Sequence, residues 1–388
     1  MSSLAFVPAF RLSALYCAYF AFVGAFMPYF GLYLASLGFA PWAIGALLSV
    51  GQFTRIFAPN IWAWFADRRG RSIELLRWAL ALAVVSFLGL FLTTGFVALL
   101  FVLAVHALFV SASMPLFEAM TLSYLHGAYG RYGSIRLWGS VGFIIAVSAI
   151  GYALDHVPTH NFLWMALLPL IGAWLVSCSI AQPPARPHAQ GESASVRQQA
   201  MRPEVLALLM AGFLMCAAHG PLYAFYSIYL DQVGYSKATV GALWALGVIA
   251  EILVFLGMPR WLSRYSPYKV LLVSFALAVV RFLLIGWGVD SLALLIIAQL
   301  MHAASFGSFH AAALTLVNAW FIGPRHVRGQ ALFSSLTYGA GAAVGAAAAG
   351  ALWQTVGPAW TYTVASAAAA CGLLLIARRG RLFPHISQ

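Results

Sequence analysis

The sequence predicts an all-α integral membrane protein whose 12 transmembrane helices form two six-helix bundles. Apolar residues make up 63% of its 388 residues and charged residues only 8%, whereas a soluble domain carries roughly 25% charged residues. The apolar residues gather in segments whose lengths are close to the about 20 residues that a helix needs to cross a bilayer. The second half of the chain also repeats the first. Little length remains for a soluble domain.

Twelve apolar segments follow one another along the chain. They cover residues 9–35, 42–66, 72–94, 97–125, 134–154, 162–180, 203–230, 239–262, 268–288, 291–320, 329–355 and 358–377. The stretch 182–202 between the sixth and seventh is rich in Pro, Gln, Ser and Ala, which predicts a flexible linker. We therefore expect an N-terminal bundle (1–181), a cytoplasmic linker (182–202) and a C-terminal bundle (203–388).

Positive charges predict the orientation. Lys and Arg concentrate in alternate loops, including Arg68, Arg131, Arg264, Arg328 and Arg378, and such loops face the cytoplasm. We therefore expect both termini inside, in a bacterial-type inner membrane. The net charge of +12 does not indicate nucleic acid, because the basic residues are spread in short runs between apolar segments.

The two halves align without a gap when the numbering is shifted by 196 residues. The matches include Tyr33 with Tyr229, Gly38 with Gly234, Gly51 with Gly247, Arg68 with Arg264 and His106 with His302. An even number of passes separates the halves, so both have the same orientation. Parallel repeats of this kind are related by a pseudo-two-fold axis along the membrane normal and place a substrate site between them, near the midplane.

The loop after the second segment carries a recognisable motif. Ala63-Trp-Phe-Ala-Asp-Arg-Arg-Gly-Arg71 resembles the G-x-x-x-D-R-x-G-R signature of the major facilitator superfamily, with Ala63 where the family usually has glycine. The resemblance implies that Asp67, Arg68, Gly70 and Arg71 form a cytoplasmic gate motif.

Five charged side chains in the apolar segments are candidates for membrane depth: Arg55, Glu118, Arg136, Glu251 and Arg281. A charge near the bilayer centre costs about 2.5 to 3.5 kcal/mol on insertion scales, so each needs a partner or a watery cavity, and such groups are functional by default. Together they sum to +1 when both acids are ionised, which favours a monoanion such as a carboxylate. Snorkelling of Arg55 or Arg136 to cytoplasmic water would remove this excess.

The most specific stretch of the first half is Tyr132-Gly-Ser-Ile-Arg-Leu-Trp-Gly-Ser140. Because a cytoplasmic turn separates Glu118 from Arg136, their helices run antiparallel and the two can pair. The arrangement resembles the lactose permease, whose glutamate and arginine at this separation bind sugar. It resembles more closely the phenylpropionate permease family, which has an acid and a YG-x-x-RLWGS sequence here. The resemblance implies substrate contacts from Glu118, Arg136, Trp138 and Ser140.

In the second half, Glu251, Arg281 and His302 match residues that the lactose permease uses for substrate and proton coupling. Ser305 replaces that permease's proton-carrying glutamate, so its coupling scheme cannot be copied. Glu251 is our first candidate for the proton carrier. The alternative is a structural ion pair of Glu251 with Arg281 or Arg55. We group these three residues with His302 as the coupling set.

Two aromatic stripes supply further candidates. His219, Tyr223 and Tyr226 share one helix face, and Phe22, Phe26, Tyr29 and Tyr33 form a similar stripe in the first segment. Such stripes usually pack or face lipid. Because these helices line the cavity in the resembling superfamily, we include Tyr29, His219 and Tyr226 among the substrate contacts. His106 and His310 also lie at membrane depth.

We expect a secondary transporter, not an enzyme, that imports a small organic substrate with protons by alternating access. An aromatic or other small carboxylate is the first choice. A sugar or nucleoside symporter, an uncoupled uniporter and an exporter stay open. A membrane enzyme lacks support, since no HExxH or GxSxG pattern occurs. An ATP-driven pump lacks support as well, since nothing in the sequence resembles a P-loop. We expect a monomer in the lipid bilayer, without cofactor, metal or nucleic acid.

Overall fold

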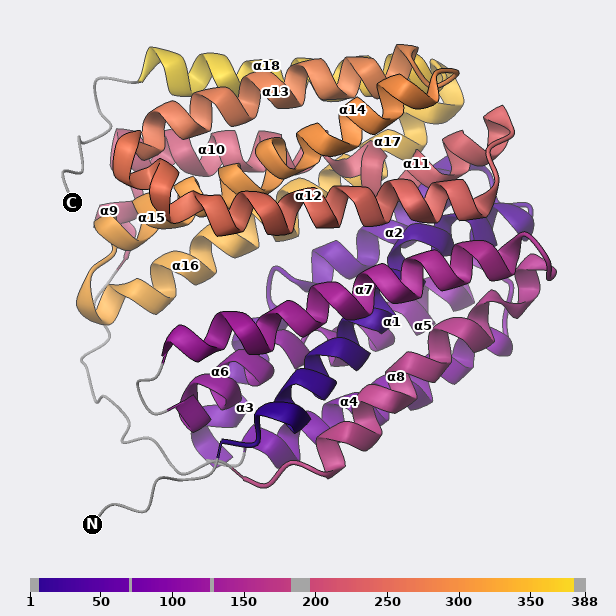
Figure 1. The fold of residues 1–388 in the computed structure, drawn as a ribbon, viewed down its shortest axis with the longest axis horizontal. Coiled ribbons are helices and arrows are strands. Elements are labelled where there is room, and N and C mark those ends of the chain that lie inside the picture. The colour runs from indigo at the N-terminus through magenta and orange to yellow at the C-terminus, as the bar shows by residue number, and fades with distance from the viewer. Residues whose placement is uncertain (1–6, 70–71, 126–128, 183–195, 380–388) are drawn as a thin grey trace.

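The structure is a computed structural model that describes residues 7–69, 72–125, 129–182 and 196–379. Within these ranges the chain is helical and contains no strand. Helices α1 to α8 form one bundle and α10 to α18 a second one beside it (Figure 1). The predicted linker 182–202 lies mostly outside the described residues, apart from the short helix α9 (Arg197–Ala200).

The first bundle contains eight α-helices in the described ranges. They are α1 (Ala9–Ser36), α2 (Pro41–Thr54), α3 (Ala58–Arg69), α4 (Ser72–Leu88), α5 (Phe96–Val110), α6 (Ser113–Leu125), α7 (Tyr132–Leu154) and α8 (Phe162–Cys178).

The second bundle contains nine α-helices and two π-helical turns. They are α10 (Pro203–Ala218), α11 (Gly220–Val233), α12 (Lys237–Arg264), α13 (Pro267–Trp287), α14 (Leu292–His302), η4 (Ala303–Ser308), α15 (Phe309–Trp320), α16 (His326–Ser334), η6 (Ser335–Gly341), α17 (Ala342–Thr355) and α18 (Pro358–Arg378).

Eleven helical stretches of the described chain are long and apolar enough to cross a membrane. The pair α2 and α3 adds the twelfth pass, because only the turn at residues 55–57 separates them. The predicted all-α fold of twelve passes is therefore confirmed.

Several predicted segments are interrupted where a proline removes a helical hydrogen bond. Proline has no N–H to donate to the carbonyl four residues earlier. Pro59 leaves the carbonyl of Arg55 without this partner where α2 ends, and Pro115 does the same to Ser111 between α5 and α6. Pro221 follows the break between α10 and α11 at His219. Each interruption leaves a polar residue at a helix end within an apolar segment: Arg55, Ser111 and His219.

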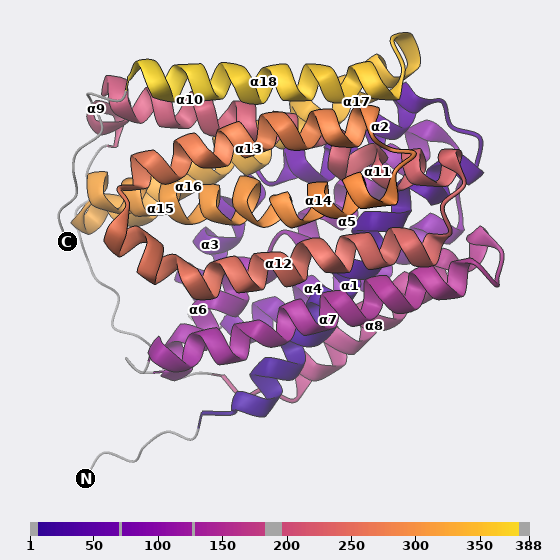
Figure 2. The same cartoon turned by 45° about the horizontal axis from the view of Figure 1, so that its top comes forward.

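The two bundles meet mainly through three helix pairs: α2 with α17, α7 with α12, and α1 with α11. Figure 2 shows α7 and α12 lying side by side along this interface. The bundles separate toward the end where α1 begins and α18 ends, here called the termini end, and converge at the opposite, far end (Figure 1).

The seam between α2 and α17 depends on two glycines. A Cβ on Gly45 would lie 2.7 Å from the carbonyl oxygen of Ala346, and one on Gly350 would lie 2.6 Å from that of Pro41. Both distances are too short for real atoms, so only glycine lets these two backbones approach so closely.

A carboxylate also joins the bundles at the far end. Asp155, just after α7, accepts hydrogen bonds from the backbone N–H groups of Lys237 and Ala238 at 2.7 and 2.9 Å. These N–H groups open α12, so the acid of one bundle caps a helix of the other, where the helix dipole favours negative charge. This contact and the glycine seam close the far end.

Candidate functional site

A cavity of about 160 Å³ lies between the bundles. Helices α1 and α7 supply Phe20, Val23, Met27, Arg136, Ser140 and Phe143 from the first bundle. The wall from the second bundle contains all the remaining charged and amide groups, namely Glu251, Arg281 and Gln299, together with His302. The cavity lies between the two halves, where the sequence repeat predicted a substrate site.

Arg136 is the charge on the first wall. Its guanidinium lies over the ring of Phe20, 4.1 Å from the centroid, and 5.7 Å from that of Tyr16. Cation–π contacts of this kind hold a guanidinium while leaving its N–H edge free for a ligand.

The expected ion pair of Glu118 with Arg136 does not form in the described structure. Glu118 lies on α6 outside the cavity lining, where the hydroxyl of Tyr132 donates to its Oε1 at 3.4 Å. The two charges act on each other at longer range. The break between α5 and α6 and the stacking of Arg136 on Phe20 account for the separation.

Of the two remaining candidates from this motif, Ser140 and Trp138, only one lines the cavity. Ser140 lines the cavity, one helical turn after Arg136. Trp138 lies between them in sequence, on another face of α7; its side chain is 50% exposed and is absent from the lining.

Arg281, on α13, is completely buried. Its Nε donates to the carbonyl oxygen of Ala298 at 2.8 Å, and its Nη2 donates to Oε1 of Gln299 at 3.3 Å. No carboxylate pairs with it anywhere in the described chain. A buried, unpaired cation is strongly unfavourable unless a ligand or polar groups compensate it.

His219 compensates Arg281 as a neutral acceptor. Its Nδ1 lies 2.8 Å from the carbonyl oxygen of Met215, and a carbonyl can only accept, so Nδ1 carries the proton. Its Nε2 then has the lone pair that faces Nη1 of Arg281 at 3.4 Å. His219 is thus placed behind Arg281 and outside the cavity lining.

Glu251, on α12, faces Arg136 across the cavity. Its Cγ would lie 3.2 Å from a Cβ placed on Gly307, so the side chain packs against the π-helical turn η4. The charge of Arg136 acts on its carboxyl group. In the described residues Glu251 forms no ion pair with Arg281 or Arg55, which contradicts the structural pair weighed from the sequence.

His302 ends α14, directly before η4, and π-helical turns are frequent at functional sites. Its ring stacks on Phe306, with centroids 5.4 Å apart, and lies 6.0 Å from the ring of His219. Its Nδ1 is buried without a hydrogen-bond partner.

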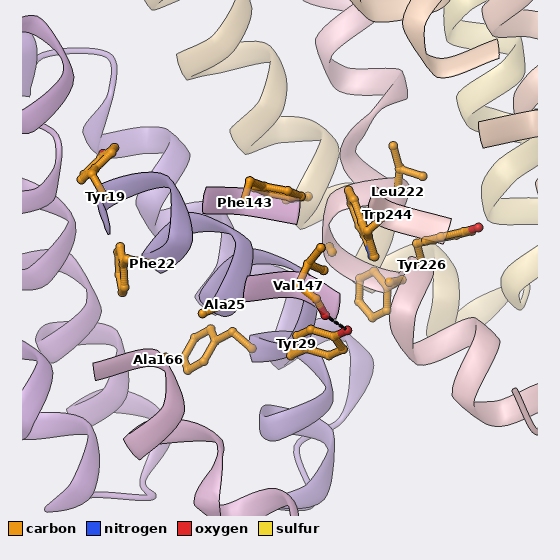
Figure 3. Close-up of a cluster of buried hydrophobic side chains, with 14 of the residues drawn as sticks. Tyr19, Phe22, Ala25, Tyr29, Phe143, Val147, Ala166, Leu222, Tyr226 and Trp244 are labelled. Atoms are coloured by element: carbon orange, nitrogen blue, oxygen red, sulfur yellow. Dashed lines mark hydrogen bonds between the residues drawn. The ribbon is translucent and has the colours of Figure 1, made fainter. Parts of the chain in front are cut away.

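The two tyrosine candidates lie outside the lining. The hydroxyl of Tyr29 donates to the carbonyl oxygen of Val147 at 2.7 Å and lies 3.3 Å from that of Lys237 (Figure 3). Tyr29 therefore bridges the bundles at the α7–α12 seam. Tyr226 is fully buried behind Trp244, and its hydroxyl lies near the side chain of Gln299.

Arg55 lies at the break between α2 and α3, where its side chain is exposed. It is not part of the cavity lining.

The gate motif falls at the edge of the described structure. Asp67 and Arg68 lie in the last turn of α3. Gly70 and Arg71 lie outside the described residues.

Sequence reasoning missed several lining residues: Phe20, Trp244, Gln299 and Phe306. An aromatic ring in an apolar segment carries no signal, since most such rings pack or face lipid. Gln299 did carry one, because an amide inside an apolar segment needs partners. No cluster of three or more His, Cys, Asp or Glu that could hold a metal occurs in the part of the chain described.

Comparisons with known proteins agree with this architecture. Residues 9–364 match the MFS_1 like family. The chain is 33% identical over 352 residues to the "Probable 3-phenylpropionic acid transporter" of Escherichia coli (strain K12), covering 88% of this chain and 90% of that protein. It is 29% identical to the "Maltose permease" of Geobacillus stearothermophilus, covering 68% of this chain and 67% of that one.

Among solved structures, a mutant of the nucleoside transporter NupG superposes with a TM-score of 0.86 at 16% identity, covering 95% of this chain and 99% of that one. This similarity concerns the fold. The relatives are transporters, not enzymes. With its twelve passes in two bundles around a charged cavity, the chain belongs to the MFS_1 like family of major facilitator superfamily transporters.

Proposed function

We propose that this secondary transporter imports a small organic monoanion, with an aromatic carboxylate as first candidate, together with protons. The observation that carries this proposal is Arg281, a completely buried cation at the cavity wall that pairs with no acid in the described chain. A carboxylate would supply the missing charge and accept two N–H groups in the fork geometry that arginine prefers.

The other cavity surfaces favour an aromatic body on that carboxylate. Phe20 and Phe143 face Tyr223, Trp244 and Phe306 across the cavity, and rings gain about 0.5–1.5 kcal/mol per favourable pair beyond their burial. Trp244 is held by its Nε1, which donates to Oγ of Ser227 at 3.0 Å. A rigid aromatic wall suits a flat ring better than a sugar, whose hydroxyls need several polar partners.

Charge suggests how a proton and an anion travel together. Arg136, Arg281 and Glu251 give the cavity lining one net positive charge when Glu251 is ionised. Protonation of Glu251 frees Arg136 from its opposing charge and strengthens the positive field for an anion. By linkage, a bound anion favours the proton on Glu251 to the same extent. Glu251 therefore serves as the proton carrier, in place of the glutamate that Ser305 replaces.

We place the termini in the cytoplasm of a bacterial-type inner membrane, which makes a state closed at the far end the inward-facing one. Alternating access then rocks bundles 1–181 and 203–388 about the cavity. The E. coli relative is named for 3-phenylpropionic acid, which makes this acid the first substrate to test. A nucleoside is the second candidate, because the chain is also 23% identical over 382 residues to the "Nucleoside permease NupG" of E. coli.

The test is uptake of radiolabelled 3-phenylpropionate into proteoliposomes. We expect accumulation when the outside is acidic, and loss of accumulation when a protonophore removes the gradient. Uptake that only equilibrates, whatever the gradient, would indicate a uniporter. Uptake of uridine or maltose with none of 3-phenylpropionate or other small carboxylates would overturn the substrate class.

A further inference from the structure

Buried polar atoms without a hydrogen-bond partner gather at one pole of the cavity. Six such side-chain atoms occur in the described chain. Two of them belong to residues that line the cavity beside Arg281: Nε2 of Gln299 and Nδ1 of His302. Folded proteins leave few buried polar groups unpaired, so two on one cavity wall indicate a polar occupant.

The hydrogen bonds of Gln299 fix the direction of its amide. Its Oε1 accepts from Nη2 of Arg281 at 3.3 Å, so the other end of the amide must be the NH2 group. That Nε2 offers two N–H donors. The nearby hydroxyl of Tyr226 can accept at most one of them, so at least one is left for a ligand, and the side chain is only 2% exposed and lines the cavity.

Arg281 keeps donors of its own for the same occupant. Its Nε, Nη1 and Nη2 each donate one bond, to Ala298, His219 and Gln299. A guanidinium has five N–H groups, so two remain. Since Gln299 and Arg281 both present donors here, the complementary ligand group is one that only accepts, which a carboxylate does and a primary amide does not.

We propose that Gln299 determines the specificity of the cavity for a carboxylate, by donating through Nε2 to one carboxylate oxygen while Arg281 donates to the other. This assigns a binding residue that lies outside the sequence motifs. This inference rests on the proposed function, because it assigns the site where the anion is recognised.

The test compares two ligands that differ in the recognised group, 3-phenylpropionate and 3-phenylpropanamide, by calorimetric binding to purified full-length protein. Wild type should bind the carboxylate at least about tenfold more tightly, the factor that corresponds to about 1.4 kcal/mol. Gln299→Leu removes the donor, so most of this preference should disappear while binding of the amide changes little.

Gln299→Glu provides the sharper variant. Its carboxylate can still accept from Arg281 but neutralises that cation and repels the ligand's charge, so carboxylate binding should fall by about 100-fold or more, as for two such charge-assisted contacts. The amide should still bind, which shows that the variant is folded. Ser274→Ala is the matched control, because Ser274 carries a buried unpartnered hydroxyl on α13 outside the cavity lining.

The outcomes are distinguishable. A wild-type preference for the carboxylate that survives in Gln299→Leu and Gln299→Glu overturns the role of Gln299 alone. A wild type without any preference for carboxylates overturns the proposed substrate class, and this inference with it. Loss of the preference in Ser274→Ala as well would mean that the effect is not specific to the cavity and would also overturn the assignment.

Discussion

The two walls of the cavity differ in kind although the two halves of the sequence match in one ungapped register. The second bundle presents a connected polar group, in which Arg281 contacts His219 and Gln299. The first bundle presents a single guanidinium, Arg136, lying on an aromatic ring. The two walls therefore share helices but not chemistry: one wall carries the polar group to which we assign recognition of the substrate, and the other contributes a charge that faces Glu251.

The histidines matched by the 196-residue shift illustrate this difference. His106 is buried against Phe22, Phe26 and Phe87, and its Nδ1 lies 3.0 Å from the carbonyl oxygen of Ala83. Its counterpart His302 lines the cavity with an unpartnered Nδ1. The same shift places Arg55 opposite Glu251, so the coupling acid of one half has a basic counterpart in the other.

The largest effect is expected for Glu251→Gln, which removes the proton carrier but keeps the shape of the side chain. Gradient-driven accumulation should fall to background, while exchange of labelled for unlabelled substrate at equal concentrations continues. Proteoliposome uptake and counterflow measure the two. If exchange is lost as well, Glu251 has a binding or structural role.

Replacing each histidine of the matched pair with alanine tests whether His106 and His302 have different roles. His106→Ala should lower thermal stability, by about 2–4 kcal/mol as for other large-to-small changes in a core, with little change in ligand affinity. His302→Ala should have the opposite pattern: ligand affinity should fall clearly, whereas thermal stability should change little. Melting in detergent and calorimetry distinguish these results, and equal behaviour of the two variants would contradict the division of roles.

Arg136→Lys should reduce substrate affinity by about tenfold. An ammonium keeps the charge but cannot lie flat on Phe20 or present a two-pronged donor edge, and the loss of one charge-assisted hydrogen bond corresponds to about this factor. Binding affinity of 3-phenylpropionate is the measurement. Affinity equal to that of wild type would remove Arg136 from the site.

The smallest effect is expected at the far end, where Asp155 caps α12 across the bundles. Asp155→Asn removes the negative charge and one of the two acceptor oxygens of this cap. The loss should cost about 0.5–1 kcal/mol at the N-terminus of α12, so the two bundles should separate at the far end a few times more often. Spin labels at His160 and Asp290, exposed on far-end loops of different bundles, report this as a larger population of long distances.

Asp231→Asn is the matched control for that change. Asp231 pairs with the side chain of Lys237 at 2.9 Å within the second bundle only, so its loss should leave the distance distribution unchanged. A shift of equal size in both variants would mean that general surface charge, and not the cap between bundles, sets the population.

The sequence predicted the membrane fold, the twelve passes and the charged residues Arg136, Glu251 and Arg281 that line the cavity, because hydropathy and embedded charge report directly on the cost of burial in lipid. It did not predict the contacts of these charges. Glu118 and Arg136 lie on neighbouring antiparallel helices, which made an ion pair plausible. Arg136 instead stacks on Phe20, and this contact depends on how α1 packs against α7. Tyr29 matched a cavity-lining pattern, yet its depth along α1 places it at the far-end seam.

The most direct test of this account is the affinity of the purified wild type and of Arg281→Gln for 3-phenylpropionate and its neutral amide. We predict that wild type prefers the carboxylate by about tenfold or more and that Arg281→Gln binds both ligands weakly and without preference. Equal binding of the two ligands by wild type, or an undiminished preference in Arg281→Gln, would contradict the claim that the unpaired buried cation recognises the substrate.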